Sequence, residues 1–126
     1  MIDRRGVTAT TRGKSLGGAM NAKQRAKYEA RAKVIKALAH PTRLLLVDEI
    51  ARHGERCVCD LTEVVGADMS TVSRHLSQLR EAGIVAQERR GVMIYYSMRV
   101  KCLNGFFNCV ESVLQSEAKK HYETLT

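Results

Sequence analysis

The sequence predicts a mostly helical domain with one small β-hairpin, in the order of four helices, two strands and a last helix. This is the order of a winged helix-turn-helix, and three observations predict it. Apolar residues recur at helical spacing along most of the chain after residue 22. Gly66 separates two helical segments at the position of a tight turn. Two segments rich in β-branched and aromatic residues then follow, joined by Arg89, Arg90 and Gly91.

The first two helices are expected at residues 23–40 and 41–53. The apolar stripe of the first helix consists of Tyr28, Ile35 and Leu38. Pro41 should end this helix, since proline disfavours the helical conformation of the residue before it, and the same proline suits the first turn of the next helix. Gly54 should end the second helix. Its predicted buried side chains are Leu44, Leu45, Val47 and Ile50.

A short helix is expected next, starting at Cys59 or Asp60 and running through Val65. Asp60 suits the N-cap because its carboxylate can accept hydrogen bonds from free backbone amides. Glu63 stands three residues later as its capping-box partner. Gly66 then makes the turn of the predicted helix-turn-helix.

The second helix of this motif is expected at residues 70–83, with Ser70 as its N-cap. Val72, Leu76 and Leu79 follow the spacing of one buried face. The other face fits DNA, because small polar residues let a helix backbone approach base edges in the major groove, and longer donors reach bases or phosphates. The candidate DNA-binding residues on this face are Ser70, Thr71, Ser73, Arg74, His75, Ser77 and Gln78.

A β-wing with a basic tip is predicted after this helix, from strands at residues 84–88 and 92–98. Arg89 and Arg90 at its turn fit contact with phosphates or with the minor groove. The last helix is expected at residues 100–122, and it carries more apolar surface than one small winged domain needs to bury. Its apolar residues are Leu103, Phe106, Phe107, Val110, Val113 and Leu114.

Charge and length limit the class of protein. The 126 residues make one domain whose modest core favours a dimer. Through Lys36 the chain has ten Lys or Arg against Asp3 and Glu29, which accounts for its whole net charge of +8. Such a basic excess favours nucleic acid. No apolar run approaches the length of a membrane span, and residues 1–22 lack the apolar core of a signal peptide.

We therefore expect a cytoplasmic protein without a membrane partner. Residues 1–22 should form a disordered basic arm, and residues 23–122 the DNA-binding and dimerisation domain. A basic arm and a first helix with a solvated charged face would give the same composition, so charge alone does not establish DNA binding.

The four cysteines favour a soft-metal or redox site. The cytosol keeps thiols reduced, and Cys57 and Cys59 stand too close for an ordinary structural disulfide. Thiolates select As(III), Sb(III), Cd(II), Pb(II) or Zn(II), but two thiolates do not complete a trigonal or tetrahedral site. Cys102 and Cys109 are the candidate further ligands. Seven residues apart on one helix, they share a face but are separated by about 10 Å along the axis, so one ion should not bind both.

Two motifs resemble the ArsR/SmtB family of metal-responsive repressors. Cys57-Val58-Cys59-Asp60 stands directly before the helix-turn-helix, and the run from Ala37 to Arg43, ALAHPTR, resembles the family's junction between first and second helices. The resemblance extends over residues 23–114 and is closest to the arsenic/antimony and cadmium/lead branches. It implies a homodimer on an inverted repeat of operator DNA, which a metal or metalloid inducer releases. As(III) or Sb(III) is the foremost inducer, followed by Cd(II), Pb(II) and Zn(II).

The resemblance also implies that the first and last helices form the dimer contact. The candidate interface residues are Tyr28, Ile35, Phe106, Phe107, Val110 and Leu114. The sequence departs from the arsenic branch at Thr62, where that branch often has a third cysteine. It departs from the cadmium/lead branch as well, because the N-terminal arm has no cysteine.

Two alternatives remain open. A thiol redox or persulfide sensor on the same fold would use Cys57 or Cys59 with Cys109, as related repressors do. A metal-storage or trafficking protein would keep the thiols but would not bind an operator. An enzyme is not expected, since no catalytic triad, phosphate loop or acid pair is present and His40 is interpreted as a helix-junction residue.

Overall fold

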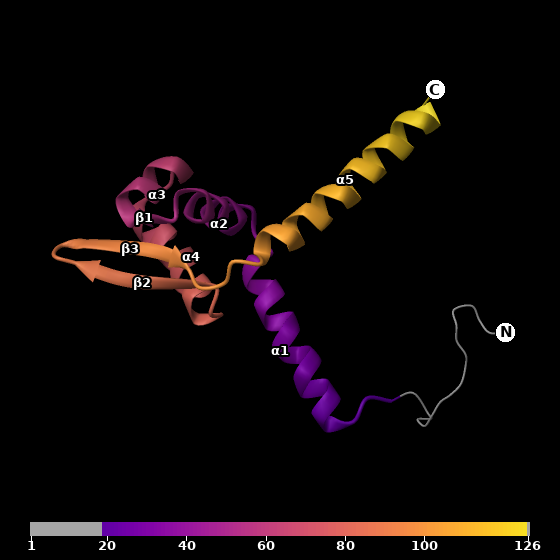
Figure 1. Ribbon diagram of the computed structural model, residues 1–126, viewed down its shortest axis with the longest axis horizontal. Helices are drawn as coiled ribbons and strands as arrows, with labels where there is room; N and C mark the ends of the chain where they lie inside the picture. Colours follow the sequence, from indigo (N-terminus) through magenta and orange to yellow (C-terminus); the bar gives the residue numbers. More distant parts are fainter. Residues whose placement is uncertain (1–18, 126) are drawn as a thin grey trace. The chain divides into compact units, whose positions relative to one another are not determined.

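The computed structural model describes residues 19–125, so most of the expected arm at residues 1–22 lies outside the described residues. The chain divides into two compact units, Met1–Lys36 and Ala37–Thr126. No helix within residues 19–125 combines the length and apolar character that a bilayer crossing requires. The elements in chain order are α1 (Ala22–Leu38), α2 (Pro41–His53), β1 (Glu55–Cys57), α3 (Val58–Val65), α4 (Met69–Glu81), β2 (Val85–Arg90), β3 (Met93–Met98) and α5 (Leu103–Leu125) (Figure 1).

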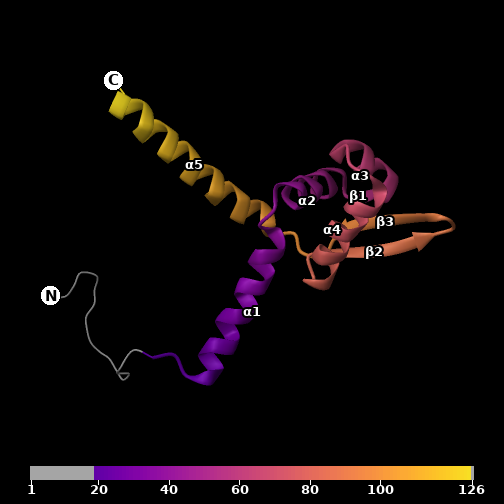
Figure 2. The ribbon, with the colours of Figure 1, turned by 180° about the vertical axis from the view of Figure 1, so that it is seen from behind.

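The predicted helices and hairpin are confirmed, with one addition. β1 extends the hairpin to a three-stranded antiparallel sheet in the order β1-β3-β2. This strand is not predicted from the sequence, because its three residues show too little alternation. Helices α2, α3 and α4 gather around the base of the β2–β3 hairpin, and the hairpin turn projects beyond them (Figures 1 and 2).

α1 begins with a capping box that the sequence analysis missed. Asn21 Oδ1 accepts from the backbone N–H of Gln24 at 2.8 Å, and Gln24 Oε1 accepts from the N–H of Asn21 at 3.1 Å. The helix ends at Leu38 rather than at His40. His40 precedes Pro41 and takes the extended conformation, φ −156° and ψ 130°, that proline imposes on the residue before it.

The core of the second unit lies between α2, the helix-turn-helix and the sheet. The predicted inner face of α4 is confirmed, since Val72, Leu76 and Leu79 have no exposed surface. This fixes the opposite face of α4 toward solvent. The core side chains are Ala37, Leu38, Leu46, Val47, Ile50, Leu61, Val72, Leu76, Leu79, Ile84, Val85 and Tyr96.

The predicted buried set of α2 was wrong in two positions. Leu44 and Leu45 are 41% and 38% exposed, whereas Leu46 is fully buried. Leu46, Val47 and Ile50 share one stripe of the helix, and Leu44 and Leu45 lie off that stripe. A run of four apolar residues hides the helical period, which explains the error.

Candidate thiol site and nucleic-acid interface

The thiol pair lies where β1 passes into α3. Cys57 is the last residue of β1 and the N-cap of α3, with an extended backbone at φ −79° and ψ 157°. Val58 starts the helix, and Cys59 follows in its first turn. This change of direction brings the two Sγ atoms to 2.6 Å, although both cysteines are free thiols. The two sulfurs are therefore joined by a hydrogen bond, in which either can be the donor.

The predicted start of α3 was wrong. The helix begins at Val58, and the cap is the sulfur of Cys57, which accepts from the backbone N–H of Asp60 at 3.4 Å. Asp60 lies inside the first turn, so the expected capping box with Glu63 does not form at the cap. Thiols are weak acceptors and therefore give little sequence signal as N-caps. The consequence is that the positive end of the helix dipole lies beside Cys57 Sγ.

The two thiols differ in environment. Cys57 is 4% exposed, and Cys59 is exposed. Burial is the main cause that raises the pKa of the Cys57 thiol above its ordinary value, and the hydrogen bond with Cys59 adds to it. Cys57 is therefore a protonated thiol until a ligand displaces its proton, while Cys59 is the thiol that solvent reaches.

Asp60 completes a group of three candidate ligands with the two thiols. One ligand atom from each of Cys57, Cys59 and Asp60 lies within 4.8 Å of the others, the one group of this kind within residues 19–125. Cys102 and Cys109 do not belong to it. Both are exposed, Cys102 just before the start of α5 and Cys109 within that helix. A single chain thus brings two of the four predicted cysteine ligands together.

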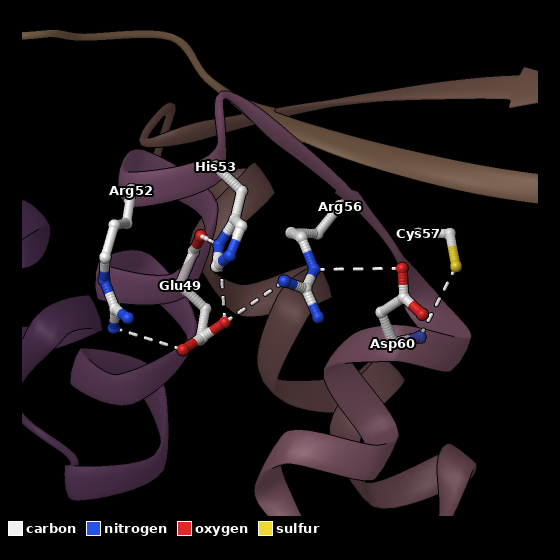
Figure 3. A network of polar contacts seen from close by, with 6 residues as sticks. All are labelled: Glu49, Arg52, His53, Arg56, Cys57 and Asp60. Carbon is white, nitrogen blue, oxygen red and sulfur yellow. Dashed lines mark hydrogen bonds and ion pairs between the residues drawn. The ribbon is translucent and has the colours of Figure 1, made fainter.

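A charged network connects this site to α2, as Figure 3 shows. Arg56 lies between two carboxylates, with Nη1 at 3.5 Å from Glu49 and Nε at 3.8 Å from Asp60. Glu49 is buried and also pairs with Arg52 at 3.1 Å and with His53 at 3.5 Å. Since Asp60 faces a guanidinium, its carboxylate is already matched by a cation, and the two sulfurs are the better ligands of the group.

The start of α4 differs from the prediction by one residue. Asp68 is its N-cap, and the helix begins at Met69 rather than after Ser70. The Ser70 hydroxyl donates to Asp68 Oδ2 at 2.6 Å. This bond, followed by one from the Thr71 hydroxyl, lowers the pKa of Asp68. The Ser70 hydroxyl is therefore held in place at the N-terminus of the recognition helix.

The candidate DNA-binding residues of α4 reach solvent to different extents. Ser70, Arg74 and Gln78 are exposed. Four others are half-buried: Thr71, Ser73, His75 and Ser77. Met69, which is not among the predicted DNA-binding residues, is 51% exposed in the first turn.

His75 is held by residues of the α1–α2 junction. Arg43 Nε donates to its Nδ1 at 3.1 Å, and the His40 and His75 rings lie 4.5 Å apart. Burial lowers the pKa of His75, and the charges of His40, Arg43 and Arg74 lower it further. The sequence places Arg43 only in the family-like junction, because no local pattern marks a partner that lies 32 residues away. His40 also caps α2, accepting at Nδ1 from the N–H of Thr42 at 3.1 Å.

The wing turn is shorter than predicted. Arg90 pairs with Met93 at the end of β2, so the turn consists of Gly91 and Val92, not of residues 89–91. Gly91 has φ +64°, which two-residue hairpin turns require, and this explains the position of the turn. Val92 is 91% exposed at the tip.

The two wing arginines have different partners. Arg90 forms a two-point ion pair with Glu55, at 2.7 Å from Nη1 and 2.9 Å from Nη2, and its Nη2 also contacts Glu88 at 2.8 Å. Its guanidinium lies over the Tyr95 ring, 4.5 Å from the centroid. Arg89 is exposed, and its side chain donates a single hydrogen bond within residues 19–125, at 3.5 Å to the carbonyl of Gly91. Arg89 is the wing arginine that can turn to a phosphate.

Apolar surface remains exposed on α5. Among its apolar side chains at residues 103–124, Leu103 and Phe107 pack against the core, and Phe107 is half-buried within its own chain. The other three predicted interface residues of this helix, Phe106, Val110 and Leu114, are 44%, 41% and 57% exposed. In α1, the predicted residues Tyr28 and Ile35 are 51% and 53% exposed.

Residues 40–87 match the family described as bacterial regulatory proteins of the arsR family. The chain is 48% identical over 65 residues to the arsenic resistance transcriptional regulator ArsR1 of Pseudomonas putida, a match of 52% of this chain and 51% of that protein. It is 37% identical over 82 residues to the arsenical resistance operon repressor of Bacillus subtilis, which covers 65% of this chain and 75% of the relative. The match thus spans about half the length of the first relative and three quarters of the second.

A solved structure with the same fold is the homodimeric winged helix-turn-helix DNA-binding domain from Mycobacterium bovis. The two chains are 29% identical with a TM-score of 0.68, over 84% of this chain and 96% of that one. This similarity confirms the winged helix-turn-helix predicted from the sequence.

Proposed function

The chain belongs to the arsR family of bacterial regulatory proteins, and we propose on this basis that it is a transcriptional repressor that leaves operator DNA when a thiophilic ion binds Cys57 and Cys59. The observation that carries the proposal is the 2.6 Å approach of the two sulfur atoms at the start of α3. α3 is the first helix of the helix-turn-helix, so the thiols adjoin the DNA-reading element.

As(III) or Sb(III) is the proposed inducer. Two relatives are named for arsenic resistance, and soft ions of this kind prefer thiolates to the oxygen of Asp60. A trigonal site requires one more sulfur, which Cys102 or Cys109 of either subunit would supply. Cd(II), Pb(II) and Zn(II) remain the alternative inducers, because thiolates bind them too.

The proposed operator contact uses the outer face of α4 and the wing. The exposed side chains of Ser70, Arg74 and Gln78 would enter the major groove, and Arg89 would bind a phosphate. The exposed apolar face of α5 would pair with a second copy of the chain, as in a homodimer that binds two half-sites.

The proposed release is a coupling between the two sites. A third sulfur drawn to the thiol pair would move the start of α3, and with it the helix-turn-helix relative to the partner subunit. A coupling of about 1–3 kcal/mol corresponds to a loss of DNA affinity of about 5- to 150-fold. Spacing between two recognition helices is sensitive to such movement because both half-sites must fit at once.

The experiment is a fluorescence anisotropy titration of the reduced protein on DNA from upstream of its own gene. It is repeated with As(III), Sb(III), Cd(II), Pb(II) and Zn(II). Release by one of these ions that Cys57→Ser and Cys59→Ser both abolish would support the proposal. Cys102→Ser and Cys109→Ser, made singly, show which of them is the third ligand. Operator binding that none of the ions changes would contradict the proposal.

A redox or persulfide sensor is the second candidate, favoured by the exposure of both Cys59 and Cys109. It predicts release by polysulfide or peroxide with no metal present, and a new bridge to Cys109 detectable by mass spectrometry. A storage protein would bind the ion and show no sequence preference for upstream DNA over scrambled DNA in the same titration.

A further inference from the structure

β1 joins the thiol site to the wing. The strand is three residues long, with Cys57 at its inner end and Glu55 at its outer end. Cys57 is paired in register with Tyr95 on β3, and Tyr95 is paired with Glu88 on β2. Directly paired residues of antiparallel strands point to the same face, so Cys57, Tyr95 and Glu88 form one row across all three strands.

The Arg90 side chain connects this row to β1, the strand that carries Cys57 and Glu55. Its guanidinium lies over the ring of Tyr95, 4.5 Å from the centroid, and both of its terminal nitrogens bind the Glu55 carboxylate, at 2.7 and 2.9 Å. Glu88 holds the same guanidinium at 2.8 Å, but from within the hairpin. The two carboxylates therefore differ in one respect: Glu55 ties Arg90 to β1, and Glu88 ties it to β2.

We propose that Arg90 is a positioning residue that couples the thiol site to the wing through Glu55. The inference rests on the proposed function, because it concerns how occupation of Cys57 and Cys59 reaches the DNA-binding surface. When a ligand draws Cys57, β1 shifts, and the Glu55–Arg90 pair moves the end of the hairpin with it. A guanidinium–carboxylate pair with two hydrogen bonds fixes the relative orientation of the two groups as well as their separation, because both bonds must keep their geometry. A shift of Glu55 therefore moves Arg90 in a defined direction.

This role accounts for the difference between the two wing arginines. In the part of the chain that the structure describes, Arg89 has no acidic partner and can bind a phosphate, whereas Arg90 is held by two carboxylates. In this arrangement Arg90 sets the position of the wing, and Arg89 contacts the DNA phosphate.

The test compares two variants of similar chemistry, Glu55→Gln and Glu88→Gln. Each removes one carboxylate from Arg90 and adds one unit of positive charge to the protein, so their general electrostatic effect on DNA binding is matched. The quantity measured is the ratio of operator affinities without and with a saturating inducer. Glu55→Gln should reduce this ratio by about two- to fivefold, the range typical of an exposed ion pair, and Glu88→Gln should leave it at the wild-type value.

Arg89→Gln is the control, because it removes the proposed phosphate contact and leaves the link between the thiol site and the wing intact. It should weaken operator binding equally in both states, so the ratio stays unchanged. Amide hydrogen exchange of residues 85–98 gives a second readout: inducer should change exchange there in the wild type and in Glu88→Gln, but less in Glu55→Gln.

The outcomes separate the two proposals. A wild-type protein that no thiophilic ion releases from DNA overturns the proposed function, and the coupling with it. A wild-type protein that responds, with an equal response in Glu55→Gln, overturns the role of Arg90 and leaves the proposed function standing. An equal loss of response in both glutamine variants also overturns it, because the link through β1 would then have no special effect.

Discussion

Arg43 Nε donates a hydrogen bond to His75 Nδ1 at 3.1 Å, so a permanent cation on α2 binds the nitrogen of a recognition-helix histidine that would otherwise take a proton. The neutral ring must then carry its hydrogen on Nε2. His40, 4.5 Å away between ring centroids, and Arg74 also lower the pKa of His75 through their charges. The recognition helix α4 is thus tied to α2 by a contact that requires a neutral histidine.

Stability should fall in mild acid because of this contact. The folded-state pKa of His75 is lowered below its ordinary value of 6.5, mainly by burial. The unfolded chain therefore binds a proton first as pH falls, so stability present above 6.5 is lost as the pH drops through the folded-state pKa. Urea unfolding from about pH 8 to about pH 5 measures this loss, across the range in which histidine titrates.

His75→Gln should flatten that dependence, and His121→Gln on the exposed part of α5 is the matched control that should keep it. An unchanged acid response in His75→Gln would show that another group causes it.

Leu76→Ala should destabilise the domain by about 2–5 kcal/mol, because a buried leucine loses both its transfer energy and its packing. Leu76 has no exposed surface and packs in the core on the inner face of α4. Gln78→Ala, two residues on and exposed, should change the free energy of unfolding by less than about 0.5 kcal/mol. Chemical denaturation of both variants checks the assignment of faces, and similar losses in both would contradict it.

Gly66→Ala should cost about 1 kcal/mol, because Gly66 has φ +75° and alanine is strained in that region. An added Cβ meets no atom within 4 Å there, so the cost comes from the backbone alone. Gly105 lies within α5, also with nothing within 4 Å of an added Cβ. Gly105→Ala should therefore stabilise that helix by up to about 1 kcal/mol. Thermal unfolding of the two variants should shift in opposite directions.

The order of helices and the inner face of α4 could be predicted because their signals are local. Val72, Leu76 and Leu79 repeat at helical spacing, and polar residues fill the gaps between them. The start of α3 could not be predicted in this way. A cysteine sulfur takes the place of the usual oxygen at its N-cap, and the short strand before it depends on pairing with β3.

The partners of the candidate site residues were beyond sequence reasoning for a related reason. Arg90 and Glu55 are 35 residues apart, and Arg43 and His75 are 32 apart. No local period marks such pairs, because the tertiary fold alone brings them together. The basic hairpin was therefore predicted correctly in composition, while the different contacts of Arg89 and Arg90 required the structure.

Leu114→Glu should weaken self-association, if the exposed face of α5 pairs with a second copy as proposed. Leu114 is 57% exposed, and a charge in an apolar interface is costly to desolvate. Gln115→Glu, on the next residue, is exposed too and adds the same charge. Sedimentation at several protein concentrations should show a larger dissociation constant for Leu114→Glu than for Gln115→Glu. Equal constants would place the dimer contact elsewhere.

The pH dependence of ligand binding should distinguish a divalent metal from arsenite. Burial raises the pKa of Cys57, so this thiol is protonated near neutral pH. Cd(II) must displace the proton, and its apparent affinity should rise by about tenfold per pH unit for each thiol proton released. Arsenous acid instead loses its hydroxides as water: each thiol proton combines with one hydroxide of As(OH)₃ as an As–S bond replaces the As–O bond, so no net proton is released. Its apparent affinity should stay nearly constant over the same range.

Titration calorimetry in two buffers of different ionisation enthalpy counts the released protons directly. The expected result is at least one proton for Cd(II) and close to none for As(III). Cys57→Ser removes the buried thiol and should lower the Cd(II) count, while Cys102→Ser should not if the third ligand is Cys109. Equal proton release for both ions would show that the buried Cys57 sulfur does not exchange its proton for the bound ion.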